Sequence, residues 1–240
     1  MPNPAWSIGR VIGYTLLVAL AFIAIDFAVG MSMAVILAAT DSAFDVEAWA
    51  AQLEADGVYL SLSTIATALV CVPFTKFLVA RHSTAPMVLL GLRRLGARTV
   101  ADWCATLAVF VLASDLLTTS LGRPIVPEFM TDIYATSPPL LLFVALVVAA
   151  PALEEVFFRG FIIGTLVASR TPALVAAVVS ALFWAAIHLQ YDLYGMATIF
   201  AGGLLLAAAR LKTGSIVPCI AMHALANAIA LAETVWISRG

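Results

Sequence analysis

The hydrophobic residues of this chain gather in long, nearly uninterrupted runs that are separated by shorter polar stretches. A helix that crosses the hydrocarbon core of a bilayer needs about 17–25 predominantly apolar residues. Seven runs reach or approach this length, and they cover residues 11–38, 58–80, 100–120, 138–168, 173–190, 195–211 and 215–237. The pattern predicts an all-α fold, a polytopic transmembrane helical bundle of about seven spans.

Composition points to lipid as the solvent of this fold. Of the 240 residues, 63% are hydrophobic and 11% are charged, whereas a soluble domain is about half apolar and about a quarter charged. A water-soluble fold of this size could not bury so much apolar surface. The net charge of −2 and the lack of a basic stripe argue against nucleic acid as a partner. The lipid bilayer is therefore the expected partner.

An acidic segment separates the first two runs. Its pattern over Phe44–Leu53 is amphipathic, which is typical of a short helix that lies in the membrane interface. The carboxylates of the segment are Asp41, Asp45, Glu47, Glu54 and Asp56.

Lysine and arginine positions predict the orientation, because short cytoplasmic loops carry an excess of both residues. If seven spans alternate, one side of the membrane receives Arg10, Lys76, Arg81, Arg93, Arg94, Arg98, Arg170, Arg210 and Lys212. The other side receives the acidic segment, a loop with several prolines, and Asp192. The N-terminus is therefore expected in the cytoplasm and the C-terminus outside.

Ionisable residues inside the runs need an explanation, since each costs at least about 2.5–3.5 kcal/mol at the centre of a span. Asp26, Asp102 and Asp115 are isolated, and we expect each to bond a neighbouring helix or to lie at the interface. The fourth run differs, because Glu154, Glu155 and Arg159 lie within six residues. Glu155 and Arg159 are four residues apart and can pair on one helix face. Glu154 lies on a different helix face from Glu155, about 100° away around the axis, and is left without a partner.

Two of the three histidines also fall within apolar runs, His188 in the fifth and His223 in the seventh. Asn227 is four residues after His223 and shares its face, and Trp184 stands in the same relation to His188. The economical arrangement brings Glu154, His188, His223 and Asn227 into one polar pocket that the Trp184 ring shields from lipid.

Such a pocket could hydrolyse a peptide bond in two ways. A shielded carboxylate and a histidine can activate water, and an asparagine amide can stabilise the resulting oxyanion. Alternatively, Glu154, His188 and His223 make a three-ligand set for one divalent metal such as Zn²⁺, with a fourth place for water. The sequence has no H-E-x-x-H motif, which excludes a zincin-type helix. Its three scattered cysteines favour packing over a thiolate site.

The polar residues resemble the CPBP family of intramembrane proteases, which includes the CAAX prenyl endopeptidases and bacteriocin-processing or immunity-associated proteins. Glu154-Glu155-x-x-x-Arg159 matches the family's E-E-x-x-x-R, and His223-x-x-x-Asn227 matches its H-x-x-x-N. The family's F-x-x-x-H aligns with Trp184-x-x-x-His188, so a tryptophan replaces the usual phenylalanine.

The resemblance implies a division of the chain and a role for each residue. Residues 1–137 would hold N-terminal transmembrane helices with the interfacial acidic segment, and residues 138–240 a CPBP-like catalytic core formed by the last four runs. The implied catalytic residues are Glu154, His188, His223 and Asn227, supported by Glu155, Arg159 and Trp184. The resemblance implies an integral protein of a bacterial plasma membrane that cleaves a membrane-anchored or membrane-proximal polypeptide. A metal and a glutamate-activated water both remain possible mechanisms.

Two other functions are compatible with the pattern. A non-catalytic scaffold or immunity protein would keep the same residues as a polar packing core. A proton- or metal-coupled transporter would use intramembrane Glu and His residues as a relay, and broken helices would support that interpretation. Gly202-Gly203 in the sixth run is the one hint of a break, and close helix packing explains it more simply.

Overall fold

The computed structural model describes residues 6–239, and this part of the chain is helical without strands. The helices of the first half are α1 (Ile8–Thr40), α2 (Val46–Ala50), α3 (Gly57–Ala80), α4 (Pro86–Leu89), α5 (Ala97–Ser120) and α6 (Glu128–Thr136), with the short 3₁₀ turn η1 (Leu53–Ala55). The second half contains α7 (Pro139–Phe143), η2 (Val144–Ala149), α8 (Ala150–Glu154), η3 (Glu155–Ile162), α9 (Ile163–Ala168), α10 (Ala173–Ala186), α11 (Leu193–Thr213) and α12 (Val217–Ile237). The predicted all-α transmembrane bundle is confirmed.

Six helices in the described part are long and apolar enough to cross a membrane, against the seven predicted. They are α1, α3, α5, the continuous segment Pro139–Ala168, α11 and α12. The fifth predicted run, residues 173–190, is helical over Ala173–Ala186 alone. At 1.5 Å per residue its 14 residues extend about 21 Å, less than the roughly 30 Å of a hydrocarbon core. His188 therefore lies in the loop after α10 and not within a span.

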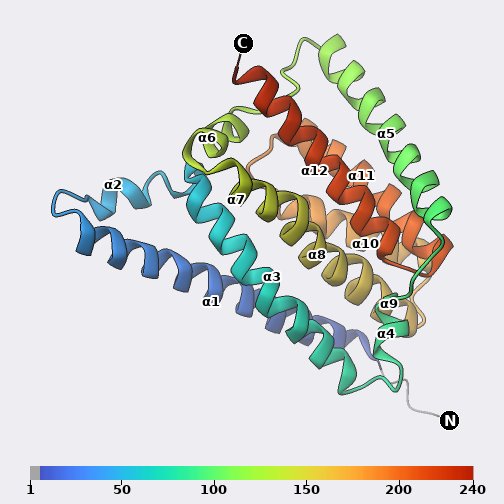
Figure 1. Cartoon of the computed structure of the whole chain (residues 1–240). Helices are drawn as coiled ribbons and strands as arrows, with labels where there is room; N and C mark the ends of the chain where they lie inside the picture. The colour runs from blue at the N-terminus through green and yellow to red at the C-terminus, as the bar shows by residue number, and fades with distance from the viewer. Residues whose placement is uncertain (1–5, 240) are drawn as a thin grey trace.

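The helices form a layered bundle around the segment Pro139–Ala168 (Figure 1). On one side α1 packs along α3, and α3 packs against the central segment. On the other side α12 lies between the central segment and α5, while α10 and α11 pair behind it. The central segment is the most deeply enclosed of the candidate spans. Any side chain that it carries inward is therefore shielded from lipid by helices of both halves.

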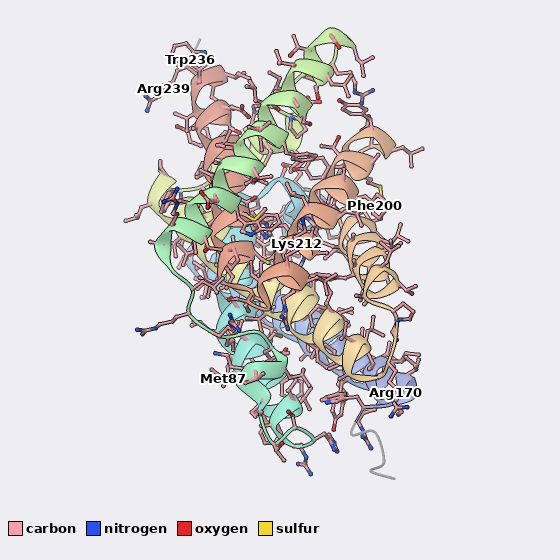
Figure 2. The ribbon with its side chains drawn as sticks, turned by 90° about the vertical axis from the view of Figure 1, so that its right-hand side faces the viewer. Met87, Arg170, Phe200, Lys212, Trp236 and Arg239 are labelled. Carbon is pink, nitrogen blue, oxygen red and sulfur yellow. The ribbon has the colours of Figure 1, made fainter. Side chains whose placement is uncertain are left out.

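The two ends of the bundle differ in charge. Met87 and Arg170 lie at one end, and Trp236 and Arg239 lie at the other (Figure 2). The loops that gather at the Met87 end hold most of the lysines and arginines predicted to share one side. We refer to this end as the basic end and to the end with α6 and the α10–α11 loop as the opposite end.

The central segment departs from regular α-helical geometry at two places, η2 and η3, which are π-helical. The N–H of Ala150 bonds the carbonyl of Ala145, and the N–H of Ile163 bonds that of Phe158, five residues back in each case. Pro151 lies between the two segments and lacks the N–H that a regular α-helix would use there. π-Helical turns occur frequently at functional sites. Glu154 ends α8 and Glu155 begins η3, so the pair lies at the start of the second irregularity.

Asp26 confirms the expectation of a partner on a neighbouring helix. Its carboxylate accepts hydrogen bonds from the Tyr59 hydroxyl at 2.7 Å and from the Ser63 hydroxyl. Both partners belong to α3, so the charge of Asp26 joins α1 to α3 inside the apolar layer. Charge-assisted hydrogen bonds of this kind offset part of the cost of placing a carboxylate in a span.

A buried arginine joins three elements at the basic end. Arg210 donates from Nε to the Arg159 carbonyl at 3.0 Å and from Nη2 to the Leu89 carbonyl at 2.8 Å. Gly91 makes room for it, because a Cβ at this position would lie 2.7 Å from Arg210 Cζ. The same glycine has a φ of +70°, which an L-residue with a side chain rarely adopts. The two hydrogen bonds of Arg210 thereby hold α4 close to Arg159 of the central segment.

Candidate active site

Trp184 lies at the centre of the predicted site. Its indole N–H donates a hydrogen bond to Glu154 Oε2, and its backbone carbonyl accepts one from His188 Nδ1 at 2.7 Å. The Trp184 ring meets the rings of His188 and His223 edge to face, each with centroids 5.3 Å apart. The guanidinium carbon of Arg159 lies 4.3 Å from the indole centroid. One buried side chain thus contacts four of the residues singled out in the sequence.

A second, fully buried cluster forms around Glu155. Its Oε1 accepts hydrogen bonds from Arg159 Nη1 at 3.0 Å and from His223 Nδ1 at 2.8 Å. The side chains of Glu155 and Arg159 are 0% exposed, so their charges compensate each other where no water can. The predicted pairing of Glu155 with Arg159 is present. The bond from His223 to Glu155 was not predicted, since the sequence pattern grouped His223 with Glu154.

The hydrogen bonds assign the proton on each histidine ring. A carbonyl oxygen can only accept, so His188 Nδ1 carries the hydrogen that bonds the Trp184 carbonyl. The same reasoning places a hydrogen on His223 Nδ1, which faces the Glu155 carboxylate. In a neutral imidazole the other nitrogen then has a lone pair. Nε2 of His188 is therefore available to accept a hydrogen bond from water.

Gly203 explains the glycine pair in the sixth run. A Cβ at this position would lie 3.0 Å from the Trp184 ring and 3.1 Å from the Ala181 side chain. Its carbonyl also accepts a hydrogen bond from Arg159 Nη2 at 3.4 Å. Gly203 lies inside the unbroken helix α11. The glycine therefore permits α10 and α11 to pack closely and does not break the helix.

Asn227 bonds a backbone carbonyl and makes no hydrogen bond within the Trp184 cluster of the described residues. Its side-chain Nδ2 donates to the Leu146 carbonyl at 2.7 Å. Leu146 belongs to the π-helical segment η2, where the backbone bonding pattern is shifted. Within the described part of the chain no hydrogen bond joins Asn227 to Glu154, His188 or His223. Three of the four predicted catalytic residues, Glu154, His188 and His223, therefore contact Trp184. The fourth, Asn227, bonds the Leu146 carbonyl.

Tyr191 belongs to the site although the sequence pattern did not reveal it. Its backbone N–H bonds the His188 carbonyl at 3.1 Å in a tight turn, and the two rings lie 6.2 Å apart. Burial, and secondarily the charge of Glu154, raises the pKa of the Tyr191 phenol to about 12. The phenol therefore stays protonated at any physiological pH. A tyrosine three residues after the site histidine, between two apolar helices, was the available signal.

Comparison with known proteins points to one family. Residues 136–229 match the model of the family described as Type II CAAX prenyl endopeptidase Rce1-like. The matched segment includes the E-E-x-x-x-R, W-x-x-x-H and H-x-x-x-N residues. This segment of the chain is therefore similar to the CAAX proteases. The match supports a CAAX-type intramembrane protease as the kind of function, and the apolar helices make the chain an integral membrane protein.

Similarity to a curated relative extends over more of the chain than the segment that matches the family model. An uncharacterised 24.3 kDa protein of Escherichia coli is 29% identical over 180 residues, which are 72% of this chain and 79% of the relative. No solved structure matches the chain significantly.

A metal ion does not fit the predicted site residues as they are arranged here. A zinc site needs its ligand atoms at about 2.0–2.2 Å from one point. Glu154 directs an oxygen at the Trp184 N–H, and His223 directs Nδ1 at Glu155. Within residues 6–239, no group of three or more His, Cys, Asp and Glu side chains is placed to hold a metal. The set of Glu154, His188 and His223 proposed from the sequence is therefore not assembled as metal ligands.

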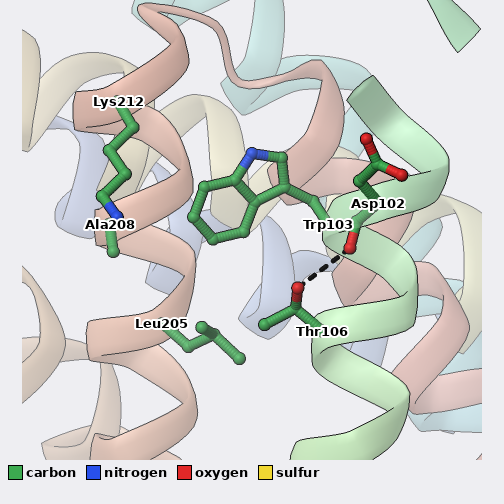
Figure 3. Close-up of a pocket in the computed structure, with 6 residues that line it drawn as sticks. All are labelled: Asp102, Trp103, Thr106, Leu205, Ala208 and Lys212. Atoms are coloured by element: carbon green, nitrogen blue, oxygen red, sulfur yellow. Dashed lines mark hydrogen bonds between the residues drawn. The ribbon is translucent and has the colours of Figure 1, made fainter. Parts of the chain in front are cut away.

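Two cavities of the described bundle lie away from the predicted site residues. A groove of about 330 Å³ lies between α5 and α11 (Figure 3). The Trp103 ring extends from α5 toward α11 in this groove, and Lys212 Nζ lies 6.0 Å from its centroid. The exposed Asp102 also lines the groove. Lysine and tryptophan are ordinary anchors where a span meets the membrane surface. A second cavity of about 460 Å³ is bordered by Arg210 and apolar residues at the basic end. Neither contains Glu154 or His188.

The loop that carries His188 and Tyr191 is fastened at its far end by Asp192. The Asp192 carboxylate accepts from the Gly195 backbone N–H at 2.9 Å and pairs with Arg123 of the α5–α6 loop. The guanidinium of Arg123 also lies 4.7 Å from the Tyr194 ring centroid. The Gly195 N–H first, and then Arg123, lowers the pKa of Asp192 below its ordinary 3.8.

Asp192→Ala is expected to lower the thermal midpoint of the protein in detergent at pH 7. Because the pKa of Asp192 is lowered by folding, its stabilising contribution is present above pH 3.8 and is lost as pH falls through the folded pKa. The difference between wild type and Asp192→Ala should therefore shrink as the pH is lowered below 3.8. Asp132→Ala, an exposed carboxylate on α6, is the control and should leave the midpoint unchanged. A pH-independent difference would contradict this role.

Proposed function

We propose that this protein is an intramembrane endopeptidase that hydrolyses a peptide bond of a membrane-anchored or membrane-proximal polypeptide. The observation that carries the proposal is the meeting of Glu154 and His188 at Trp184. Glu154 ends α8 and accepts the indole N–H bond of Trp184. His188 follows α10, bonds the Trp184 backbone carbonyl and packs its ring edge to face against the indole. A carboxylate and a neutral imidazole beside each other are the groups needed to activate a water molecule.

Glu154 acts as the general base. As the water oxygen bonds to the carbonyl carbon of the substrate, one of its protons passes to the Glu154 carboxylate, and the carbonyl electrons move to oxygen. His188 Nε2 accepts a hydrogen bond from the other water hydrogen and thereby orients the attack. When the C–N bond breaks, Glu154 returns the proton to the departing amine. One water is consumed, and the products are a carboxyl group and an amine.

The Glu155 cluster packs against Trp184, which in turn bonds Glu154 and His188. Arg159 contacts both Glu155 and the indole ring of Trp184. His223 likewise bonds Glu155 and packs its ring on Trp184. The position of the Trp184 N–H, and with it the orientation of Glu154, therefore depends on the buried ion pair. Rigid support of this kind keeps reacting groups within the narrow geometry that catalysis requires.

The charge distribution favours an orientation in which the site is reached from outside. The α10–α11 loop lies at the opposite end of the bundle, away from the basic loops. Because cytoplasmic loops are enriched in Lys and Arg, the basic end would face the cytoplasm of a bacterial plasma membrane. The N-terminus would then be cytoplasmic, and substrate would approach the His188 loop from the outer leaflet.

The test compares the membrane proteomes of cells that express wild type or His188→Ala. We expect at least one membrane polypeptide to persist in a longer, uncleaved form in the His188→Ala cells, because water is no longer oriented for attack. His82→Ala, in the α3–α4 loop at the basic end, is the matched control and should leave processing intact. Equal processing in wild-type and His188→Ala cells, with equal amounts of both proteins in the membrane, would refute the proposal.

One observation favours a second candidate, a non-catalytic scaffold. The cluster of Glu155, Arg159 and His223 is joined by two internal hydrogen bonds, which is compatible with a polar packing core, while Glu155 Oε2 and Arg159 Nε are buried without a partner. A scaffold would accumulate no precursor in the His188→Ala cells. A scaffold would instead lose stability in His188→Ala. The comparison of wild-type and His188→Ala cells therefore distinguishes the two functions.

A further inference from the structure

The proposed hydrolysis requires hydrogen-bond donors for the substrate carbonyl oxygen. When water attacks a carbonyl group, negative charge develops on its oxygen, and preorganised hydrogen-bond donors stabilise that charge. The sequence pattern assigned this task to the amide of Asn227. In the structure, Nδ2 of Asn227 donates one of its two N–H groups to the Leu146 carbonyl at 2.7 Å. A further donor close to Glu154 and His188 would strengthen the site.

Tyr191 has the position for this task. Its backbone N–H closes a tight turn on the His188 carbonyl at 3.1 Å, so the two side chains leave the same short loop. The two rings lie 6.2 Å apart with a tilt of 52°. The charge of Glu154 also acts on the phenol. The Tyr191 side chain therefore lies close to His188 and within reach of the charge of Glu154, the two groups that activate water.

The Tyr191 hydroxyl is a free donor. Within residues 6–239 it makes no hydrogen bond, whereas the neighbouring Tyr194 hydroxyl bonds Thr118 at 2.8 Å. The raised pKa keeps its proton in place throughout the pH range of the reaction. A half-buried hydroxyl that lacks a protein partner and cannot ionise is suited to bond a substrate oxygen.

The surroundings hold the Tyr191 ring in one orientation. Phe129 of α6 meets it edge to face, with centroids 5.0 Å apart. On its other side, a Cβ at position 195 would lie 2.8 Å from Tyr191 Cδ1, so Gly195 leaves the space that the ring occupies. Asp192 then begins α11 directly after the tyrosine. A donor fixed in this way needs no reorganisation when charge develops, which is the condition for effective electrostatic stabilisation.

We propose that Tyr191 is a further catalytic residue, whose hydroxyl donates a hydrogen bond to the substrate carbonyl oxygen as that oxygen becomes an oxyanion. The phenol keeps its proton throughout, and the bond strengthens as charge grows on the acceptor. This role rests on the proposed peptidase function. It adds a donor from the α10–α11 loop to the amide of Asn227, one N–H of which bonds η2.

The test measures cleavage by Tyr191→Phe in proteoliposomes. The probe is the purified precursor that accumulates in the His188→Ala cells. We expect kcat to fall about 10²–10³-fold, the usual effect of removing one oxyanion donor, while KM changes little. The phenylalanine ring keeps the contacts with Phe129 and His188, so the thermal midpoint should not move. Tyr194→Phe, which loses the bond to Thr118 in the same region, is the matched control and should retain the wild-type kcat.

A second measurement separates catalysis from packing. A phosphinate analogue of the precursor, with a tetrahedral phosphorus at the scissile position, mimics the oxyanion. Its affinity should fall in Tyr191→Phe by a factor close to the loss in kcat, while the affinity for uncleaved precursor stays unchanged. An unchanged kcat, or equal losses of analogue and precursor binding, would overturn the role of Tyr191 and leave the peptidase proposal intact. If wild type and Glu154→Gln cleave the precursor equally, the peptidase proposal itself fails, and the role of Tyr191 fails with it.

Discussion

Glu154→Gln is expected to slow cleavage of the precursor about 10²–10⁴-fold, the usual contribution of a general base. Glutamine cannot accept the proton of the attacking water, but its carbonyl oxygen can still accept the hydrogen bond that Trp184 donates to Glu154. The shape of the site and the packing of α8 on α10 should therefore survive. The measurement is kcat for the purified variant in proteoliposomes, together with its thermal midpoint.

A matched control for this variant is Glu233→Gln. Glu233 is a half-buried carboxylate of α12 that lies outside the Trp184 and Glu155 clusters. Glu233→Gln should keep the wild-type kcat. This result would show that the loss of an intramembrane carboxylate outside the site does not slow cleavage. Glu154→Gln with wild-type kcat and a normal midpoint would exclude Glu154 as the base and would remove the main support for the peptidase.

Arg159→Met is expected to lower the free energy of unfolding by about 3–5 kcal/mol, the cost of leaving a buried charge without its partner. Methionine removes the guanidinium that bonds Glu155 at 3.0 Å, and both side chains are 0% exposed. The carboxylate of Glu155 would keep only the bond from His223. The variant also loses the contact of the guanidinium with Trp184, so cleavage should fall as well. Equilibrium unfolding by denaturant in mixed micelles measures the change.

The double variant Glu155→Leu/Arg159→Met distinguishes an unpaired charge from lost packing. Replacing both members of a buried ion pair by apolar residues is often neutral or stabilising. The double variant should therefore recover part of the stability that Arg159→Met loses. Arg170→Met, which changes an exposed arginine at the basic end, should stay within about 0.5 kcal/mol of wild type. A loss below about 1 kcal/mol in Arg159→Met would mean that this ion pair does not hold the core together.

The sequence was informative about the site wherever the relevant contacts are local. Glu155 and Arg159 are four residues apart on one helical segment, and they pair as predicted. His188 and Trp184 have the same spacing, and the structure joins the ring of one to the carbonyl of the other. Contacts at this spacing depend on the pitch of a single helix, which the residues themselves specify.

The grouping of side chains from different helices was less predictable. Asn227 bonds Leu146 and not the histidine cluster, because η2 and η3 shift the backbone bonding of the central segment away from α-helical register. Tyr191 was missed because its role depends on a turn that ends α10 early. A short polar loop has no hydrophobic periodicity from which such a turn could be predicted.

The sequence by itself determined that this chain is a membrane-embedded helical bundle, and it determined which residues are costly to place there. Lipid offers the backbone no hydrogen bonds, so long apolar runs have to become helices whatever their neighbours are. Only the tertiary structure decided that His223 bonds Glu155 and that Trp184 joins Glu154 to His188. These contacts join residues far apart in the chain, and they depend on how closely α10 and α11 pack at Gly203 and on the irregular turns of the central segment.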